Sequence, residues 1–183
     1  MAITYNTTIN QGADWFINFI YNQPALITNL IADGDTVTFT ANNGFEQGQT
    51  VSISGVLPNQ YNFQNVEVAS ANTNQFTVEN PATGVYISGG VAYAPVNITG
   101  DTAAMQLRSL PNDPTAVLTL TTANNGIAIT GLTGEIAVHA TANQTRVINE
   151  GYYYYDLELT QAVSGIVTRI AQGQILVSAE ITR

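Results

Sequence analysis

The sequence predicts an all-β protein, because strand-like alternation and turn signals follow each other along most of the chain. In Thr36–Ala41, the residues Val37, Phe39 and Ala41 share one face and three threonines share the other. This period of two is typical of a strand with one buried face. Turn formers such as Asn42-Asn43-Gly44 separate the stretches. Many short strands with frequent turns indicate a sandwich or a barrel.

The expected elements follow in chain order. Pro24–Ile31 fits a strand or a helix, and we favour the strand because it runs into the Asp33 turn. Ala142–Glu150 has polar spacing and ends at Gly151, which predicts one short helix. The other elements are strands, expected at Thr36–Ala41, Thr50–Ser54, Val66–Ala69, Gln75–Glu79, Val85–Ser88, Ala104–Arg108, Ala116–Thr122, Ile127–Thr130, Glu135–Ala140, Tyr152–Gln161, Gly165–Ala171 and Gln174–Ile181.

Composition shifts near Pro24 and Pro95 predict two modules. Residues 25–93 contain no Arg and are rich in Asn, Gln, Thr and Gly, whereas all four Arg follow this stretch. We therefore expect a host domain formed by 1–24 and 94–183, with 25–93 inserted into it.

Charge and composition exclude several functions. Charged residues make up 9% of the chain, Lys is absent and the net charge is −9. Nucleic-acid binding needs clustered cations, so we expect no nucleic-acid partner. The absence of Cys excludes disulfides and thiolate chemistry. No apolar stretch approaches the ~20 residues that span a bilayer, so we expect no membrane partner either.

Three patterns could carry chemistry, and each has a simpler explanation. His139 shares a strand face with Glu135, which could orient it as a base, but no nucleophile motif accompanies the pair. Asp156 and Glu158 share a strand face, as glycosidase carboxylates could, yet they lie opposite an apolar face. Asp33-Gly34-Asp35 offers Ca²⁺ ligands but reads better as a turn. We expect no enzyme activity, no catalytic residue, no cofactor and no metal.

The run Tyr152–Tyr155 is the most unusual local feature. Alternation buries Tyr153 and Tyr155 and exposes Tyr152 and Tyr154. Exposed tyrosines favour protein interfaces and sugar-binding surfaces, although ordinary aromatic cover of a wide sheet explains them equally well. The two cations Arg108 and Arg169 are expected to pair with carboxylates. The candidate interaction residues are Tyr152, Tyr154, Asp156, Glu158, Arg108, Arg169, Tyr61 and Tyr86.

Neutral strand faces favour assembly. Thr, Asn and Gln give little repulsion between copies, and strand edges without Lys are hazardous in a free monomer. Such edges are tolerable where neighbouring subunits cover them, so the sequence predicts a homo-oligomer or a subunit of a larger structure.

The outer segments carry motifs that resemble a known family. These are Thr7–Trp15, Asn97–Arg108, Leu132–Ile136, Gly151–Leu159, Val167–Gly173 and Glu180–Arg183. Their order resembles that of small β-sandwich virion proteins of tailed bacteriophages, especially those of cyanobacteria and marine hosts. It is also similar to the N-terminal module of phage baseplate upper proteins. The resemblance covers 1–24 and 94–183.

The middle segment resembles a different small β module, found in phage tail and fibre proteins. Its marks include Asn43-Gly44-Phe45, Gly48–Gly55 and Phe76-Thr77-Val78. The resemblance implies a jelly-roll-like β-sandwich host domain with an inserted β-barrel-like module of roughly five strands.

The resemblance also implies a function. We expect a non-enzymatic structural component of the phage particle, in multiple copies on the tail, baseplate or neck and in contact with other virion proteins. The alternatives are a head decoration protein on the capsid and an adhesin that binds a host surface glycan. The expected location is the virion, assembled in the host cytoplasm.

Overall fold

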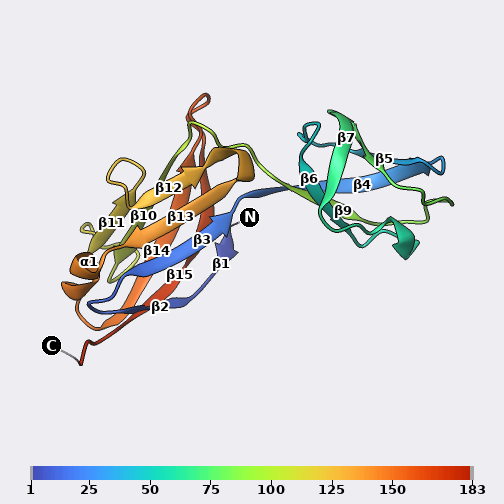
Figure 1. Ribbon diagram of the computed structural model, residues 1–183. Helices are drawn as coiled ribbons and strands as arrows, with labels where there is room; N and C mark the ends of the chain where they lie inside the picture. The colour runs from blue at the N-terminus through green and yellow to red at the C-terminus, as the bar shows by residue number, and fades with distance from the viewer. Residues whose placement is uncertain (1, 182–183) are drawn as a thin grey trace. The chain divides into compact units, whose positions relative to one another are not determined.

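The computed structural model describes residues 2–181, and almost all of their regular structure is β, as predicted (Figure 1). The chain divides into two compact units, one formed by residues up to Tyr21 and from Asn97 onward, the other by Asn22–Val96. The boundaries expected at 24/25 and 93/94 lie inside two strands that pair with each other. Of the terminal motif, Thr182 and Arg183 lie outside the described residues.

A six-stranded sheet forms the larger layer of the first unit. Its strands are ordered β1-β15-β14-β10-β11, and β2 also pairs with β15. The pairings of β1 and β2 with β15 are parallel, and the others are antiparallel. The bounds are β1 Ile3–Thr4, β2 Thr7–Asn10, β10 Thr102–Arg108, β11 Leu118–Thr121, β14 Gly151–Thr160 and β15 Val167–Ser178.

A three-stranded sheet covers one face of this layer, so the unit is a β-sandwich (Figure 1). Its order is β12-β13-β3, with β3 Trp15–Ile20, β12 Ile127–Thr130 and β13 Glu135–Ala140. Apolar side chains fill the space between the sheets; the largest fully buried ones include Ile9, Met105, Leu107, Leu120, Ile136 and Leu157. We call the face of the larger sheet that packs on this core its inner face, and the opposite one its outer face.

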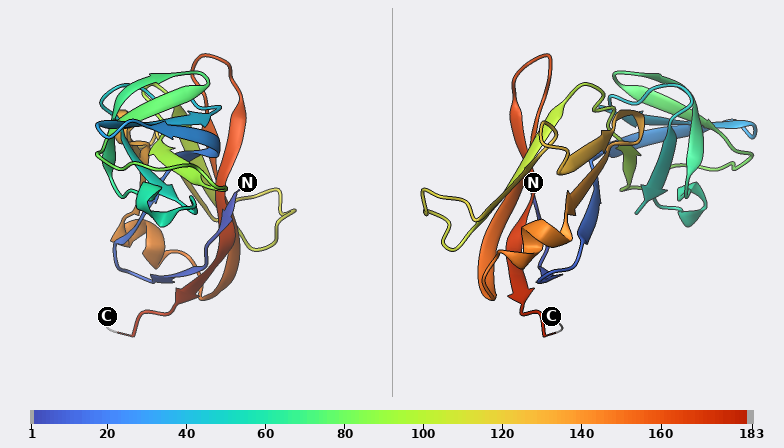
Figure 2. Two further views of the ribbon diagram at one scale, coloured as in Figure 1. Left: turned by 90° about the vertical axis from the view of Figure 1, so that its right-hand side faces the viewer. Right: turned by 60° about the vertical axis from the view of Figure 1, so that its left-hand side comes forward.

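The second unit is a closed barrel of six strands, one more than expected (Figure 2). Its order is β4-β5-β8-β7-β6-β9, with β4 Asn22–Ala32, β5 Thr36–Ala41, β6 Thr50–Ser54, β7 Val66–Asn72, β8 Gln75–Glu79 and β9 Val91–Pro95. Val37, Phe39 and Ala41 point into the barrel as predicted, and the ring of Phe39 stacks on Phe76 at 5.0 Å. The strand prediction for Pro24–Ile31 is confirmed by β4.

Three expected strands differ in the structure: one does not form, and the other two are a single strand, because glycines act differently there. Val85–Ser88 forms only one bridge, Leu57 to Ser88, since Gly84, Gly89 and Gly90 all have positive φ and interrupt the alternation. Gly165–Ala171 and Gln174–Ile181 merge into the single strand β15. Gly173, which looked like a break, is instead a close approach of two backbones, because a Cβ there would collide with the Tyr5 carbonyl oxygen.

The helical elements are short. Helix α1 spans Ala142–Arg146, less than the expected stretch, and begins with a capping box between Thr141 and Gln144. Two 3₁₀ turns complete the set, η1 at Asn59–Tyr61 in the barrel and η2 at Gly131–Thr133 in the sandwich.

A candidate binding cleft on the six-stranded sheet

Strand β14 sorts its side chains between the two faces of the sheet as the alternation predicts. Tyr153 and Tyr155 are buried on the inner face, followed by Leu157 and Leu159. On the outer face Tyr152 is 68% exposed and Tyr154 is 37% exposed. Asp156 and Glu158 continue this row and are partly exposed. Four of the predicted interaction residues therefore share one face of one strand.

A β-bulge brings Arg169 to the same face. The β14–β15 register pairs Leu157 with Ala171 but Glu158 with Arg169, so Ile170 is the extra residue. Strict alternation from Ala171 would point Arg169 into the core. The bulge reverses the alternation, as bulges do when they redirect a side chain, and both Ile170 and Ala171 are buried instead.

The redirected guanidinium joins the two carboxylates, which confirms the expected pairing of Arg169. Its Nη2 lies 3.0 Å from Asp156 Oδ2 and 3.5 Å from Glu158 Oε1. Its Nη1 donates to Gln172 Oε1 at 3.3 Å. All three charged side chains are 38–48% exposed, so solvent screens the pairs and their contribution to stability is small. Their main effect is to hold four polar side chains in a fixed arrangement.

The prediction for Arg108 is wrong. No carboxylate of residues 2–181 lies within ion-pair distance of its guanidinium. Arg108 donates instead to Gln106 Oε1 at 2.6 Å and to the backbone carbonyl of Asp113. The Asp113 carboxylate is used by the loop itself, where it accepts from the Leu110 amide at 2.9 Å. In the β10–β14 register Arg108 lies opposite Tyr154, on the outer face.

These side chains line a cleft of about 510 Å³. Tyr154, Asp156, Arg169 and Arg108 are four of the eight predicted interaction residues, and all four contribute to it. The loop between β10 and β11 supplies Pro111, and Figure 2 shows this loop standing out from the larger sheet. Sequence reasoning missed the amides that complete the lining, which are Asn6, Gln106, Gln172 and Gln174. For Gln106, Gln172 and Gln174, the alternation with buried residues of β10 and β15 was the available signal. Asn6 lies between β1 and β2 and gave no such signal.

The two tyrosines predicted in the barrel do not form an exposed surface. Tyr61 is fully buried, and its hydroxyl has no hydrogen-bond partner among the described residues. Tyr86 packs partly against the barrel core, and its hydroxyl lies 3.2 Å from the Ile27 carbonyl oxygen and 3.1 Å from that of Gly89. Both rings serve the packing of the barrel.

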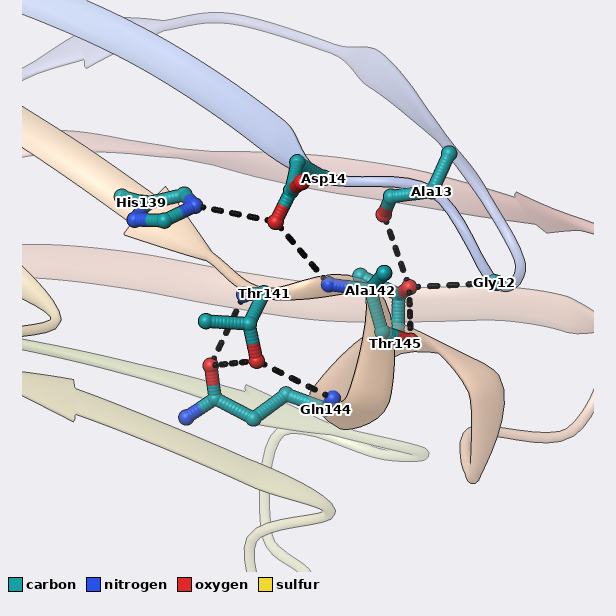
Figure 3. A network of polar contacts seen from close by, with 8 residues as sticks. All are labelled: Gly12, Ala13, Asp14, His139, Thr141, Ala142, Gln144 and Thr145. Carbon is teal, nitrogen blue, oxygen red and sulfur yellow. Dashed lines mark hydrogen bonds and ion pairs between the residues drawn. The ribbon is translucent and has the colours of Figure 1, made fainter.

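His139 lies on the smaller sheet and belongs to a network that joins β3 to α1 (Figure 3). Its Nε2 lies 3.2 Å from Asp14 Oδ1, which also accepts from the Ala142 amide at 3.0 Å. Phe16 stacks on the imidazole at 4.2 Å. The expected orienting residue, Glu135, instead accepts from Asn18 at 3.2 Å. The hydroxyl of Thr145 is used to bond the turn at Gly12 and Ala13, so the network is structural.

Asp33 closes a turn, as we expected. Its Oδ1 accepts from the Thr36 amide at 2.7 Å and from the Asp35 amide at 3.0 Å. These bonds, the Thr36 amide first, lower the pKa of the carboxyl. Among residues 2–181, no three His, Asp or Glu side chains gather as a metal site would require.

Neither the family models nor the curated proteins give a relative of this chain. Within the described residues, no helix has the length and hydropathy needed to cross a membrane. The function therefore has to be argued from the geometry above.

Proposed function

We propose that this chain is a non-enzymatic structural component of a tailed bacteriophage particle, assembled in multiple copies on the tail, baseplate or neck. The motif order of the outer segments suggested this class, and the sandwich with an inserted barrel agrees with the architecture that the resemblance implies. A structural subunit also needs a surface that contacts neighbouring subunits. One strand of the sandwich is best suited to this contact.

The observation that carries the proposal is the free edge of β3. Within residues 2–181, this strand pairs with β13 on one side and with no strand on the other. Its sequence, Trp15–Ile20, contains no charged residue and no Pro. Unpaired backbone groups on such an edge form a template for another strand, and monomeric proteins usually protect them with Lys or Pro. A neighbouring subunit that covers the edge resolves the hazard.

Large apolar side chains also lie exposed beside this edge. Phe16 is 68% exposed and Ile20 is 59% exposed on the outer side of β3, and Leu132 in η2 is exposed as well. Large exposed side chains of this kind mark contact surfaces when they gather on one face. Ile20 pairs with Glu135 and Phe16 with His139, so polar groups border the apolar ones. Repetition in a ring or lattice would multiply a weak contact at this edge.

Analytical ultracentrifugation of the purified chain over a concentration series tests the proposal. We expect the chain to self-associate reversibly. The association constant should be at least tenfold lower in the double variant Phe16→Thr/Ile20→Thr. The matched control is Leu26→Thr/Ile31→Thr, which removes two comparably exposed side chains from the barrel strand β4 and should leave association unchanged. A wild-type chain that stays monomeric at its highest soluble concentration and does not bind phage particles would contradict the proposal.

Head decoration is the alternative location for the same kind of protein. It differs in copy number rather than in surface chemistry, because a decoration protein follows the capsid lattice. Counting copies per particle separates the two locations.

A further inference from the structure

We propose that the cleft on the six-stranded sheet binds a neutral oligosaccharide. This inference goes beyond the structural role, since it assigns a ligand to a surface on the opposite layer of the sandwich from β3. Four features of the cleft carry it: its size, its hydrogen-bonding groups, its charge balance and its tyrosines.

The size of the cleft suits a small ligand. Its volume of about 510 Å³ lies within the ~300–1,000 Å³ that ligand pockets usually have. Strand residues form the floor, and the loop with Pro111 contributes on one side. The β10 and β14 backbones beneath are held by seven consecutive residue pairs, so the floor is rigid. A preformed site of this kind loses little entropy on binding.

The amides leave hydrogen-bond donors available. Gln106 Oε1 accepts from Arg108, Gln172 Oε1 accepts from Arg169, and Asn6 Oδ1 accepts from the backbone N–H of Gln174 at 2.8 Å. Each oxygen is therefore used by the protein, while the NH₂ group of the same side chain makes no hydrogen bond within residues 2–181. Each NH₂ offers two donors. A ligand rich in acceptor oxygens fits them.

The cleft also offers acceptors, which distinguishes a sugar from an anion. Asp156 pairs with Arg169 through Oδ2, so its Oδ1 can accept from a ligand hydroxyl. Arg108 keeps several of its five N–H donors, because it uses only those that bond Gln106 and Asp113. Sugar hydroxyls donate and accept at once, so they match a surface with both kinds of group. A phosphate or carboxylate ligand would leave Asp156 opposed to a like charge.

The charge balance favours a neutral ligand. The charged residues that line the cleft are Arg108, Arg169 and Asp156. Glu158, which pairs with Arg169 just outside the lining, brings the sum of these four charges to zero. The whole chain carries a net charge of −9, which would repel an acidic polymer at long range.

The tyrosines supply an apolar contact. Tyr154 lines the cleft, and Tyr152 lies two residues farther along the same face of β14. The two positions are about 7 Å apart along the strand, so a ligand longer than one sugar ring is needed to contact both. Large rings of this kind give extensive contact at low entropic cost. The ligand is therefore an oligosaccharide rather than a single sugar.

The test is saturation-transfer NMR of the full chain with short neutral oligosaccharides of glucose, galactose, mannose and N-acetylglucosamine, and with oligogalacturonate as the acidic probe. We expect at least one neutral probe to bind with a Kd of about 1 mM or tighter, and the acidic probe not to bind. Tyr154→Ala and Gln172→Ala should each weaken binding at least fivefold. The control is Tyr93→Ala, which removes an exposed tyrosine from the barrel and should change nothing.

Three outcomes would overturn the inference. They are no binding by any neutral probe, binding of the acidic probe alone, and binding that persists in both cleft variants while their folds are intact by circular dichroism. None of these outcomes affects self-association through β3, because the variants leave that strand unchanged. Failure of the sugar site is thus distinguishable from failure of the structural role.

Discussion

At the scale of single residues, two tyrosines of the barrel have opposite surroundings. The Tyr61 hydroxyl is buried without a hydrogen-bond partner among residues 2–181, whereas the Tyr86 hydroxyl can donate to a backbone carbonyl of Ile27 or Gly89. An unpaired buried hydroxyl carries a desolvation penalty that no hydrogen bond offsets. A hydrogen bond that is formed contributes about 1 kcal/mol to stability.

We therefore predict that removing the hydroxyl has opposite effects on stability at these two tyrosines. Tyr61→Phe should raise the free energy of unfolding by about 1 kcal/mol, and Tyr86→Phe should lower it by about 1 kcal/mol. Urea unfolding of both variants beside the wild type measures the difference. A loss of stability in Tyr61→Phe would show that its hydroxyl is satisfied.

The buried hydroxyl of Tyr155 should make the stability of the protein fall at high pH. Burial, with a smaller effect of Tyr5, raises its pKa to about 12, and its hydroxyl donates to the Tyr5 carbonyl at 2.8 Å. The unfolded chain has a tyrosine pKa near 10, so above about pH 10 the unfolded state loses this proton first. The stabilising difference is fully present below pH 10 and is lost as the pH rises toward 12. Unfolding free energies measured across this range should fall more steeply in the wild type than in Tyr155→Phe, with Tyr152→Phe as the exposed control.

At the scale of elements, the edge of the larger sheet depends on one glycine. Gly173 in β15 lies where the β1–β2 connection crosses, and a Cβ there would strike the Tyr5 carbonyl oxygen. The backbone has to shift to accept it, which typically costs about 1–3 kcal/mol. Gly173→Ala should show this loss in thermal unfolding. Gly44→Ala is the control, because its Cβ would meet only the flexible end of Gln23; equal losses in both variants would contradict this explanation.

Elements with clean alternation were predictable from sequence, and elements with local irregularities were not. β5 and β14 sort their residues as the pattern requires. β3 was missed because Phe16 and Ile20 are large and exposed, which hides its period of two. The outward position of Arg169 depends on the bulge at Ile170, and nothing in the local sequence indicates that extra residue. Arg108 was wrongly paired because the nearby Asp113 carboxylate is used in its own loop.

The candidate site was predictable in part for the same reasons. The outer row of β14 follows from alternation, and Arg108 and Arg169 were singled out because cations are rare in this chain. The amide at Asn6 could not be found, because it reaches the cleft through the parallel pairing of the N-terminal strands with β15. Tyr61 was mistaken for a surface residue because its neighbours Gln60 and Asn62 are polar.

At the scale of the whole molecule, the points where the chain enters and leaves each unit are held together within that unit. This arrangement favours independent folding of the two units. In the barrel, Asn22 pairs with Pro95, so the two ends of the inserted segment meet. In the sandwich, the Tyr21 amide donates to the Gly134 carbonyl and the Ile98 amide to that of Gly131, so both junctions are tied to the same turn. Each unit also has its own buried core.

Separation of the units should therefore preserve both folds. We predict that residues 22–96 expressed alone unfold cooperatively, and that a chain in which a short Gly-Ser linker replaces 22–96 keeps its β structure. Circular dichroism and thermal unfolding of the two pieces measure this. Aggregation or a featureless spectrum for either piece would show that the units depend on each other.

Quantitative mass spectrometry of purified phage particles, counting copies of this chain per particle, tests the structural role most directly. The account predicts that the chain is present as a small multiple of a three-fold or six-fold ring, as repeated contacts through β3 would give. A number that matches the major capsid protein would move the same role to the head surface. Complete absence of the chain from the particles would contradict the account.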